Sequence, residues 1–175
     1  MRSANVAARI LVVAALLPLV AGQCRDEDAK KRSDLGITLG QTSIDDVHKR
    51  IENLPDFETV EVGETWSTFR VEATYIDLST GPGGGITDVQ IFEQDPLKTT
   101  VCLGVRGLYI GDPKKKFERN LFSKGRDGMF KMMKTTDYPG DVDGTSMQVA
   151  WKEGDTAMFI HYFVSPTTGG EGPSD

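Results

Sequence analysis

The apolar run over residues 10–20 is the feature that most limits how this chain of 175 residues can fold. Arg2 and Arg9 precede the run, and small residues follow it. The run is too short for a membrane-spanning helix, which needs about 20 apolar residues. A short apolar run between basic and small residues is typical of a secretory signal peptide. We therefore assign residues 1–23 to a signal peptide and expect an exported protein, in the periplasm or outer envelope of a bacterium or otherwise outside the cell.

The sequence after the signal peptide predicts one folded domain between two polar segments. Residues 24–34 are charged and lack an apolar pattern, so we expect a polar linker there. Residues 165–175 have the composition of a disordered tail. Residues 35–164 have the length of one ordinary domain and contain no second long apolar run. We therefore expect a water-soluble mature protein with a single domain.

Apolar spacing predicts short helices followed by strands. Thr42 or Ser43 can cap a helix whose apolar stripe includes Val47 and Ile51. Asp112 followed by Pro113 predicts the start of another helix. A cluster of Met and Phe residues at 129–133 favours a short third helix. Alternating or continuous apolar residues predict strands over residues 60–62, 69–75, 86–92, 99–105, 147–151 and 157–164.

These elements together predict an α+β fold, with short helices packed on one face of an antiparallel sheet. Val149, Trp151 and Phe159 are expected on the dry faces of the last two strands. A Gly-apolar-x-apolar-Gly pattern precedes both longer helices, at 36–40 and 107–111. The domain is therefore a candidate for a tandem duplicated helix-sheet module with repeats 35–105 and 106–164, although so simple a pattern also arises by chance.

Gly36-Ile37-Thr38, followed by a polar cap and a helix with the pattern Val-x-x-x-Ile, resembles the opening motif of SmpA/OmlA-type envelope lipoproteins. A tandem copy of such a module is similar to the β-lactamase inhibitory protein fold. The resemblance covers two stretches of about 16 residues. It implies helices on one face of an antiparallel sheet and a second face that is available to a protein partner.

Cys24 leaves three alternatives open. Ala21-Gly22-Gln23-Cys24 resembles the lipobox of bacterial lipoproteins, which implies lipid attachment at Cys24 and a tether to the membrane. Gln23 departs from that pattern, because the family has a small residue at this position. Cys24 is otherwise free or paired with Cys102 in an oxidising compartment.

Charge is distributed unevenly along the chain. The formal net charge of −6 becomes −8 without the two arginines of the signal peptide, which disfavours nucleic-acid binding. Ten acids and one base lie between Glu52 and Asp95, whereas eight bases and two acids lie between Lys114 and Lys134. This basic segment is either a solvated face or a docking surface for an acidic protein or membrane. The candidate partner-binding residues, called the basic set below, are Lys114, Lys115, Lys116, Arg119, Lys124 and Arg126.

Motifs for catalysis or metal binding are weak. His48 and His161 are the two histidines, and neither has metal-ligand spacing. An EF-hand aligned on Gly144 fails, because Pro139 and Ala150 fall on ligand positions. We therefore expect no catalytic residue, metal or cofactor from the motifs.

The function expected from the sequence is that of a secreted or membrane-tethered, non-enzymatic envelope protein that binds another protein. One alternative is a small secreted hydrolase with a carboxylate site that includes Asp141 and Asp143. Another is a carrier of a lipid or small ligand in a pocket between helix and sheet. A deep cleft with convergent carboxylates would favour the enzyme, and a shallow sheet face would favour the binder.

Overall fold

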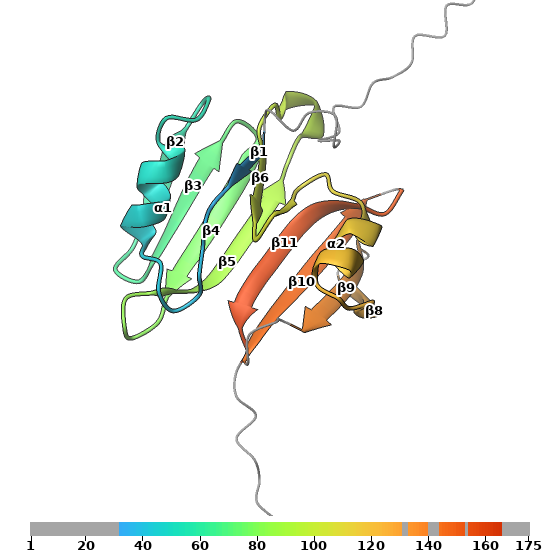
Figure 1. Ribbon diagram of the computed structural model, residues 1–175. Coiled ribbons are helices and arrows are strands. Elements are labelled where there is room, and N and C mark those ends of the chain that lie inside the picture. Colours follow the sequence, from blue (N-terminus) through green and yellow to red (C-terminus); the bar gives the residue numbers. More distant parts are fainter. Residues whose placement is uncertain (1–31, 131–132, 140–143, 153, 166–175) are drawn as a thin grey trace, which may run out of the picture.

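The computed structural model describes residues 32–130, 133–139, 144–152 and 154–165. Its main element is an eight-stranded sheet with the order β2-β3-β4-β5-β11-β10-β9-β8, in which every neighbouring pair is antiparallel (Figure 1). The strands are β2 (Glu58–Val62), β3 (Trp66–Val71), β4 (Thr74–Thr80), β5 (Ile86–Glu93), β8 (Arg126–Phe130), β9 (Met133–Pro139), β10 (Thr145–Lys152) and β11 (Thr156–Val164).

A second, small sheet lies against the middle of the large one. It has the order β1-β6-β7, with β1 (Arg32–Asp34) parallel to β6 (Cys102–Val105) and β6 antiparallel to β7 (Leu108–Tyr109). Residues 32–34, expected in the linker, therefore form an edge strand. The strand expected over 99–105 begins only at Cys102, and a 3-10 turn, η2 (Pro96–Lys98), precedes it.

Two short α-helices lie on the same face of the large sheet as the small sheet, one on either side of it, as Figure 1 shows. Helix α1 (Ile44–Ile51) begins at Ser43, whose side chain and that of Asp46 each accept a hydrogen bond from the other residue's backbone N–H. This is a complete capping box. Helix α2 (Lys114–Asn120) has Pro113 as its N-cap and no side-chain cap.

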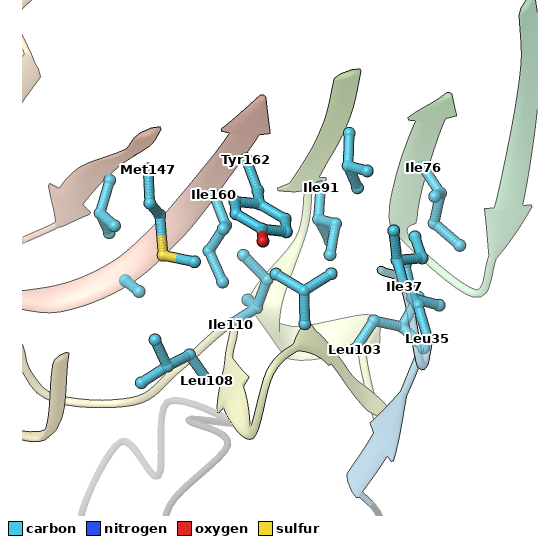
Figure 2. Close-up of a cluster of buried hydrophobic side chains, with 14 of the residues drawn as sticks. Leu35, Ile37, Ile76, Ile91, Leu103, Leu108, Ile110, Met147, Ile160 and Tyr162 are labelled. Carbon is cyan, nitrogen blue, oxygen red and sulfur yellow. The ribbon is translucent and has the colours of Figure 1, made fainter. Parts of the chain in front are cut away.

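The expected α+β fold is wrong, because the protein is dominated by β-structure. Strands make up 51% of the described residues and helices 14%. Helices of eight and seven residues are too short to cover an eight-stranded sheet. The small sheet and its flanking segments cover the centre instead, with Leu35, Ile37, Leu103, Leu108 and Ile110 packed against the large sheet (Figure 2).

The expected helix at 129–133 is also wrong. Residues 126–130 form β8, which pairs with β9 from Arg126 opposite Asp137 to Phe130 opposite Met133. Met and Phe are compatible with either structure in so short a run, and pairing with β9 decides the outcome. β9, which extends to Pro139, is not among the strands expected from the sequence.

Burial alternates along the strands and defines two faces of the large sheet. Ile76, Ile91, Ile160 and Val149 are fully buried beneath the small sheet and helices. The residues between them point to the opposite face, since successive side chains in a strand alternate. In Figure 1 the small sheet and both helices lie on one face of the large sheet, and no described helix or strand lies over the other face, which we call the open face. Val149 and Trp151 are buried as expected, whereas Phe159 is half-buried and lies on the open face.

Several expectations concern residues outside the described part of the chain. These are the signal peptide, Cys24, the tail from residue 166, and the acidic pair Asp141 and Asp143. The division into two repeats stays a prediction. Among the described residues, no helix has the length and apolar character needed to cross a bilayer.

Candidate functional site

Aromatic side chains cross the centre of the open face. β11 alternates between buried Ile160 and Tyr162 on one side and half-buried Phe159, His161 and Phe163 on the other. On neighbouring strands, Tyr75 and Phe92 stack with ring centroids 5.0 Å apart. Phe92 of β5 lies directly opposite Phe159 of β11. We call these five residues the aromatic stripe: Tyr75, Phe92, Phe159, His161 and Phe163.

Rings contact one another within two groups of the aromatic stripe, Tyr75–Phe92 and Phe159–His161–Phe163, and the register of β5 and β11 places the two groups side by side at Phe92 and Phe159. The His161 ring stacks on Phe163 at 4.3 Å and is 6.2 Å from Phe159, measured between ring centroids. Offset or tilted aromatic pairs of this kind contribute beyond the apolar area that they bury. The stripe is therefore a rigid apolar surface on central strands, which are held on both sides by pairing.

A hollow of about 370 Å³ lies beside the stripe. Phe92 and Phe159 line one part of it, and Met133 and Met158 add adaptable thioether side chains. Gln90, Glu93, Thr135, Gln148 and Ala150 complete the lining. Its size and apolar character suit one large apolar side chain of a partner or a small apolar ligand. A second hollow of about 550 Å³ adjoins Phe163 and is lined by more polar residues, including Arg126, Asp137 and Gln148.

Polar groups at the stripe are already paired with each other. His161 Nε2 lies 2.6 Å from Asp88 Oδ2, and Gln90 donates to the other carboxylate oxygen of Asp88 at 3.3 Å. Burial acts to raise the pKa of Asp88, but the hydrogen bond and charge of His161 outweigh it and lower the pKa. On β10, Gln148 donates to Asp137 at 2.7 Å. These pairs give the open face a defined polar pattern around its apolar centre.

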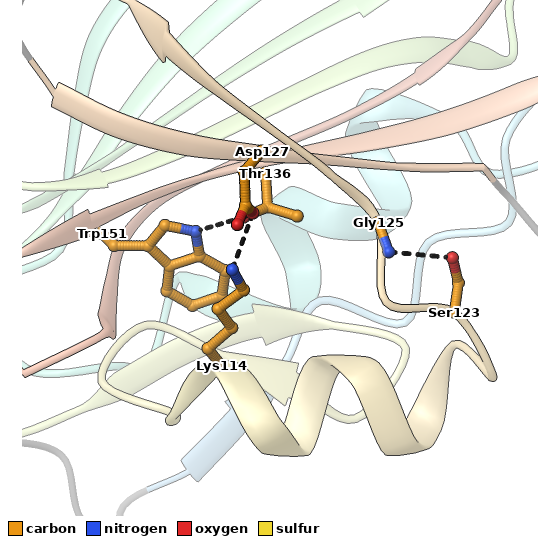
Figure 3. Close-up of polar contacts among 6 residues, drawn as sticks. All are labelled: Lys114, Ser123, Gly125, Asp127, Thr136 and Trp151. Atoms are coloured by element: carbon orange, nitrogen blue, oxygen red, sulfur yellow. Dashed lines mark hydrogen bonds and ion pairs between the residues drawn. The ribbon is translucent and has the colours of Figure 1, made fainter.

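The basic set does not form one surface. Lys114 Nζ contacts Asp127 at 2.7 Å, and Lys116 Nζ contacts the fully buried Asp112 at 3.0 Å. The two lysine side chains are 20% and 13% exposed. Figure 3 shows Lys114 reaching from α2 toward the buried Trp151 and its partner Thr136. Both lysines therefore attach α2 to the rest of the domain.

The other four members of the basic set are exposed but divided between the two faces. Lys115 and Arg119 are on α2, and Lys124 follows it. Asp127 faces α2, so Arg126, one residue before it in β8, points to the open face. Whether any of the six binds a partner stays a prediction.

No described constellation supports nucleophilic or metal chemistry. His48 packs against the rings of Phe57 and Phe69 and lies 3.6 Å from Glu52, a position on the flank of α1. Cys102 is buried and disulfide-bonded, so it is not a free thiol. The described residues contain no group of three or more His, Cys, Asp or Glu side chains that could hold a metal ion.

Sequence reasoning missed the aromatic stripe. The run from Ala157 to Val164 is nearly continuous in apolar residues, and such a run indicates a central strand without saying which residues lie on which face. The other members of the aromatic stripe, Tyr75 and Phe92, come from β4 and β5, about 70 to 85 residues before Phe159 in the chain. Only the register between β5 and β11 brings Phe92 and Phe159 together.

Comparison with known proteins gives a distant likeness in fold. No family model and no curated protein matches the chain. A DUF4309 family protein from Bacillus subtilis is similar, with 13% identity, a TM-score of 0.43 and a match over 74% of this chain and 83% of that one. A cysteine-rich secretory protein from Staphylococcus aureus is similar with 11% identity and a TM-score of 0.40, over 72% of this chain and 44% of that one. At these scores, function has to be argued from the residues of this chain.

Proposed function

We propose that this protein is an exported, non-enzymatic binding protein that holds another protein against the open face of its large sheet. The observation that carries the proposal is the aromatic stripe with its adjoining apolar hollow. Aromatic residues, Met and Arg are enriched in protein interfaces, and anchors in the centre of an interface fill apolar pockets of this kind. Phe92 and Phe159 are the proposed anchors, and the His161–Asp88 and Gln148–Asp137 pairs form the polar surroundings.

Export is part of the proposal and rests on the signal peptide expected at residues 1–23. The disulfide at Cys102 supports it, since disulfides persist mainly in oxidising compartments outside the cytosol. The sequence contains one other cysteine, Cys24. A sulfur that carries a lipid cannot also form a disulfide, so a disulfide between Cys24 and Cys102 and a lipid tether at Cys24 exclude each other. The intact mass of protein from the native host, before and after reduction, distinguishes cleavage, lipidation and disulfide pairing at Cys24.

The two other functions expected from the sequence gain less support. The hydrolase needs Asp141 and Asp143, which lie outside the described residues. The carrier needs a pocket between helix and sheet, where α1 and α2 instead pack Val47, Ile51 and Phe117 into the core. The hollow on the open face still suits a small apolar ligand, which makes a carrier the second candidate.

Capture of partners from the envelope and secreted fractions of the native host tests the proposal. Wild-type protein is compared with Phe92→Ala/Phe159→Ala on the open face, and with Lys115→Gln/Arg119→Gln/Lys124→Gln as a matched control on exposed positions elsewhere. We expect a protein that the control captures as well as wild type does and that the open-face variant loses. Loss of the captured protein in the control variant alone would show that the basic set, and not the open face, is the binding surface. A captured lipid or small molecule in place of a protein would favour the carrier.

A further inference from the structure

The two edges of the large sheet hold most of the exposed apolar side chains of the described residues. At the β2 edge, Val60 and Val62 of β2 and Trp66 of β3 are exposed, Val62 by 67%. At the opposite edge, Met129 of β8 is 70% exposed, and Phe122, in the segment leading into β8, is 96% exposed. All five residues of β2 are exposed. An edge strand with exposed apolar residues and unpaired backbone groups is a template for pairing with another strand.

The two edges carry opposite charge. Asp56, Glu58, Glu61 and Glu64 lie in or beside β2, where Arg70 is the neighbouring base and is bound to Glu58. Lys124, Arg126 and Lys134 lie in or beside β8. Of the acids there, Asp127 is bound to Lys114, and Asp137 of β9, opposite Arg126, accepts a hydrogen bond from Gln148. An acidic edge with apolar residues therefore stands at one end of the sheet, and a basic edge with apolar residues stands at the other.

Strand direction makes the edges complementary between copies. The sheet has eight strands and each pair is antiparallel, so β2 and β8 run in opposite directions. When a second copy continues the sheet in the same orientation, its β2 lies antiparallel to β8 of the first. Glu61 pairs with the outward Thr68, so it shares the open face with Arg126, and Val62 and Met129 share the covered face. Opposite charges thus lie on one face of the contact and apolar side chains on the other, within diagonal reach of each other across the two strands.

We propose that copies of this protein associate head to tail, with β2 of one copy paired with β8 of the next in a sheet that continues across the contact. Symmetric pairing is disfavoured, because β2 against β2 brings Glu58 and Glu61 of two copies together and β8 against β8 brings the basic residues together. A contact between two different edges is heterologous, so it produces open chains of copies with one free edge of each kind, or a closed ring where the rotation from copy to copy allows it. The open faces of successive copies all lie on the same side of the shared sheet, related by its twist.

Sedimentation velocity of the mature chain at increasing concentration tests the association, with two variants that each block one edge. Val62→Lys places a charge in the β2 edge, and Met129→Lys places one in the β8 edge. Both positions are exposed, so circular dichroism and melting temperature are expected to match wild type. Each variant alone is expected to associate at least about tenfold more weakly than wild type, because edge lysines oppose strand pairing. An equimolar mixture has one intact β2 edge and one intact β8 edge facing each other, and is expected to form dimers and nothing larger.

Comparison of the mixture with each variant alone distinguishes head-to-tail contact from symmetric contact. A variant that dimerises alone as well as wild type would show a symmetric contact through its intact edge and overturn the proposal. Wild type that stays monomeric at all concentrations, or a mixture that stays monomeric where wild type associates, would overturn it as well. As a second measurement, Glu61→Arg and Arg126→Glu are each expected to weaken association, and the double variant carrying both is expected to recover it. Failure of that recovery would contradict the assigned charge contact.

Discussion

The two halves of the large sheet are built alike in outline but are held together differently. Strand order from the central β5–β11 pair outwards runs β5-β4-β3-β2 in one direction and β11-β10-β9-β8 in the other, and a short helix precedes each set along the chain. Helix α1 is fixed by its own neighbours in sequence through the Ser43–Asp46 capping box. Helix α2 lacks a side-chain cap and is fixed by residues far away in sequence.

The attachment of α2 consists of buried rings and linked polar groups. Phe117 is fully buried and meets Trp151 edge-on, with ring centroids 5.2 Å apart. The Trp151 indole N–H donates to Thr136 at 2.8 Å, and the Thr136 hydroxyl donates to Asp127, which also binds Lys114 of α2. The difference between the halves is that the start of α1 is encoded locally by its capping box, whereas α2 has no such local signal and depends on tertiary contact.

Truncation of the α2 anchor is expected to have the largest effect. Phe117→Ala removes a fully buried ring and leaves a cavity against Trp151, so the free energy of unfolding is expected to fall by about 3–5 kcal/mol. Urea denaturation followed by tryptophan fluorescence measures the change. Val47→Ala, a smaller truncation beneath α1, is the matched control. An equal or larger loss for Val47→Ala would show that the halves do not differ as described.

Removal of one hydroxyl beneath α2 is expected to have the second largest effect. Thr136→Val keeps the shape of the side chain but leaves the buried indole N–H of Trp151 without its acceptor, which costs about 1–3 kcal/mol. Thr136→Ser keeps the acceptor and is the control. Thermal unfolding of the three proteins compares them, and equal melting temperatures for the Val and Ser variants would refute the role of the hydrogen bond.

Loss of the α1 cap is expected to have a smaller effect. Ser43→Ala removes the acceptor for the Asp46 backbone N–H, and such changes cost about 1 kcal/mol. Ser43→Thr retains an acceptor and should stay close to wild type in chemical denaturation. If Ser43→Ala left the stability unchanged, α1 would be held by tertiary contacts alone, as α2 is.

The smallest expected effect is a pH dependence at the same cap. Hydrogen bonds from the Ser43 side chain and backbone lower the pKa of Asp46 below its ordinary value of 3.8. A carboxyl group with a lowered folded-state pKa adds stability above its unfolded pKa, and this is lost as the pH falls through the folded value. The difference in unfolding free energy between wild type and Asp46→Asn should therefore be present at neutral pH and shrink below about pH 3.8. A difference that is constant down to pH 2 would contradict the assignment.

The same contrast explains what could be predicted from the sequence. Ser43, one of the two expected caps, and the buried pair Val47 and Ile51 were predicted correctly, because an N-cap and a helical stripe lie within one short window. Asp112 was expected at the start of α2, but Pro113 is the N-cap. Asp112 is instead fully buried, where it accepts from the Tyr109 N–H and binds Arg32 and Lys116. Those partners include a residue 80 positions away, which no local pattern indicates.

The candidate site depends still more on distant pairing. Phe92 and Phe159 are apolar residues in strands that the sequence predicts, yet their common face follows only from the β5–β11 register. The basic set was visible as a charge cluster, but the sequence did not indicate that Lys114 and Lys116 are paired inside the domain. Composition alone overestimates the charge available to a partner, because internal ion pairs use part of it.

Photo-crosslinking in the native host tests most directly whether the open face is the binding surface. A photoreactive phenylalanine analogue replaces Phe159 on the open face in one variant and Lys115 on α2 in another. We predict a crosslinked product with a specific protein from position 159, lost when Phe92→Ala is added, and no such product from position 115. Crosslinking to a protein from position 115 and not from position 159 would contradict the central claim.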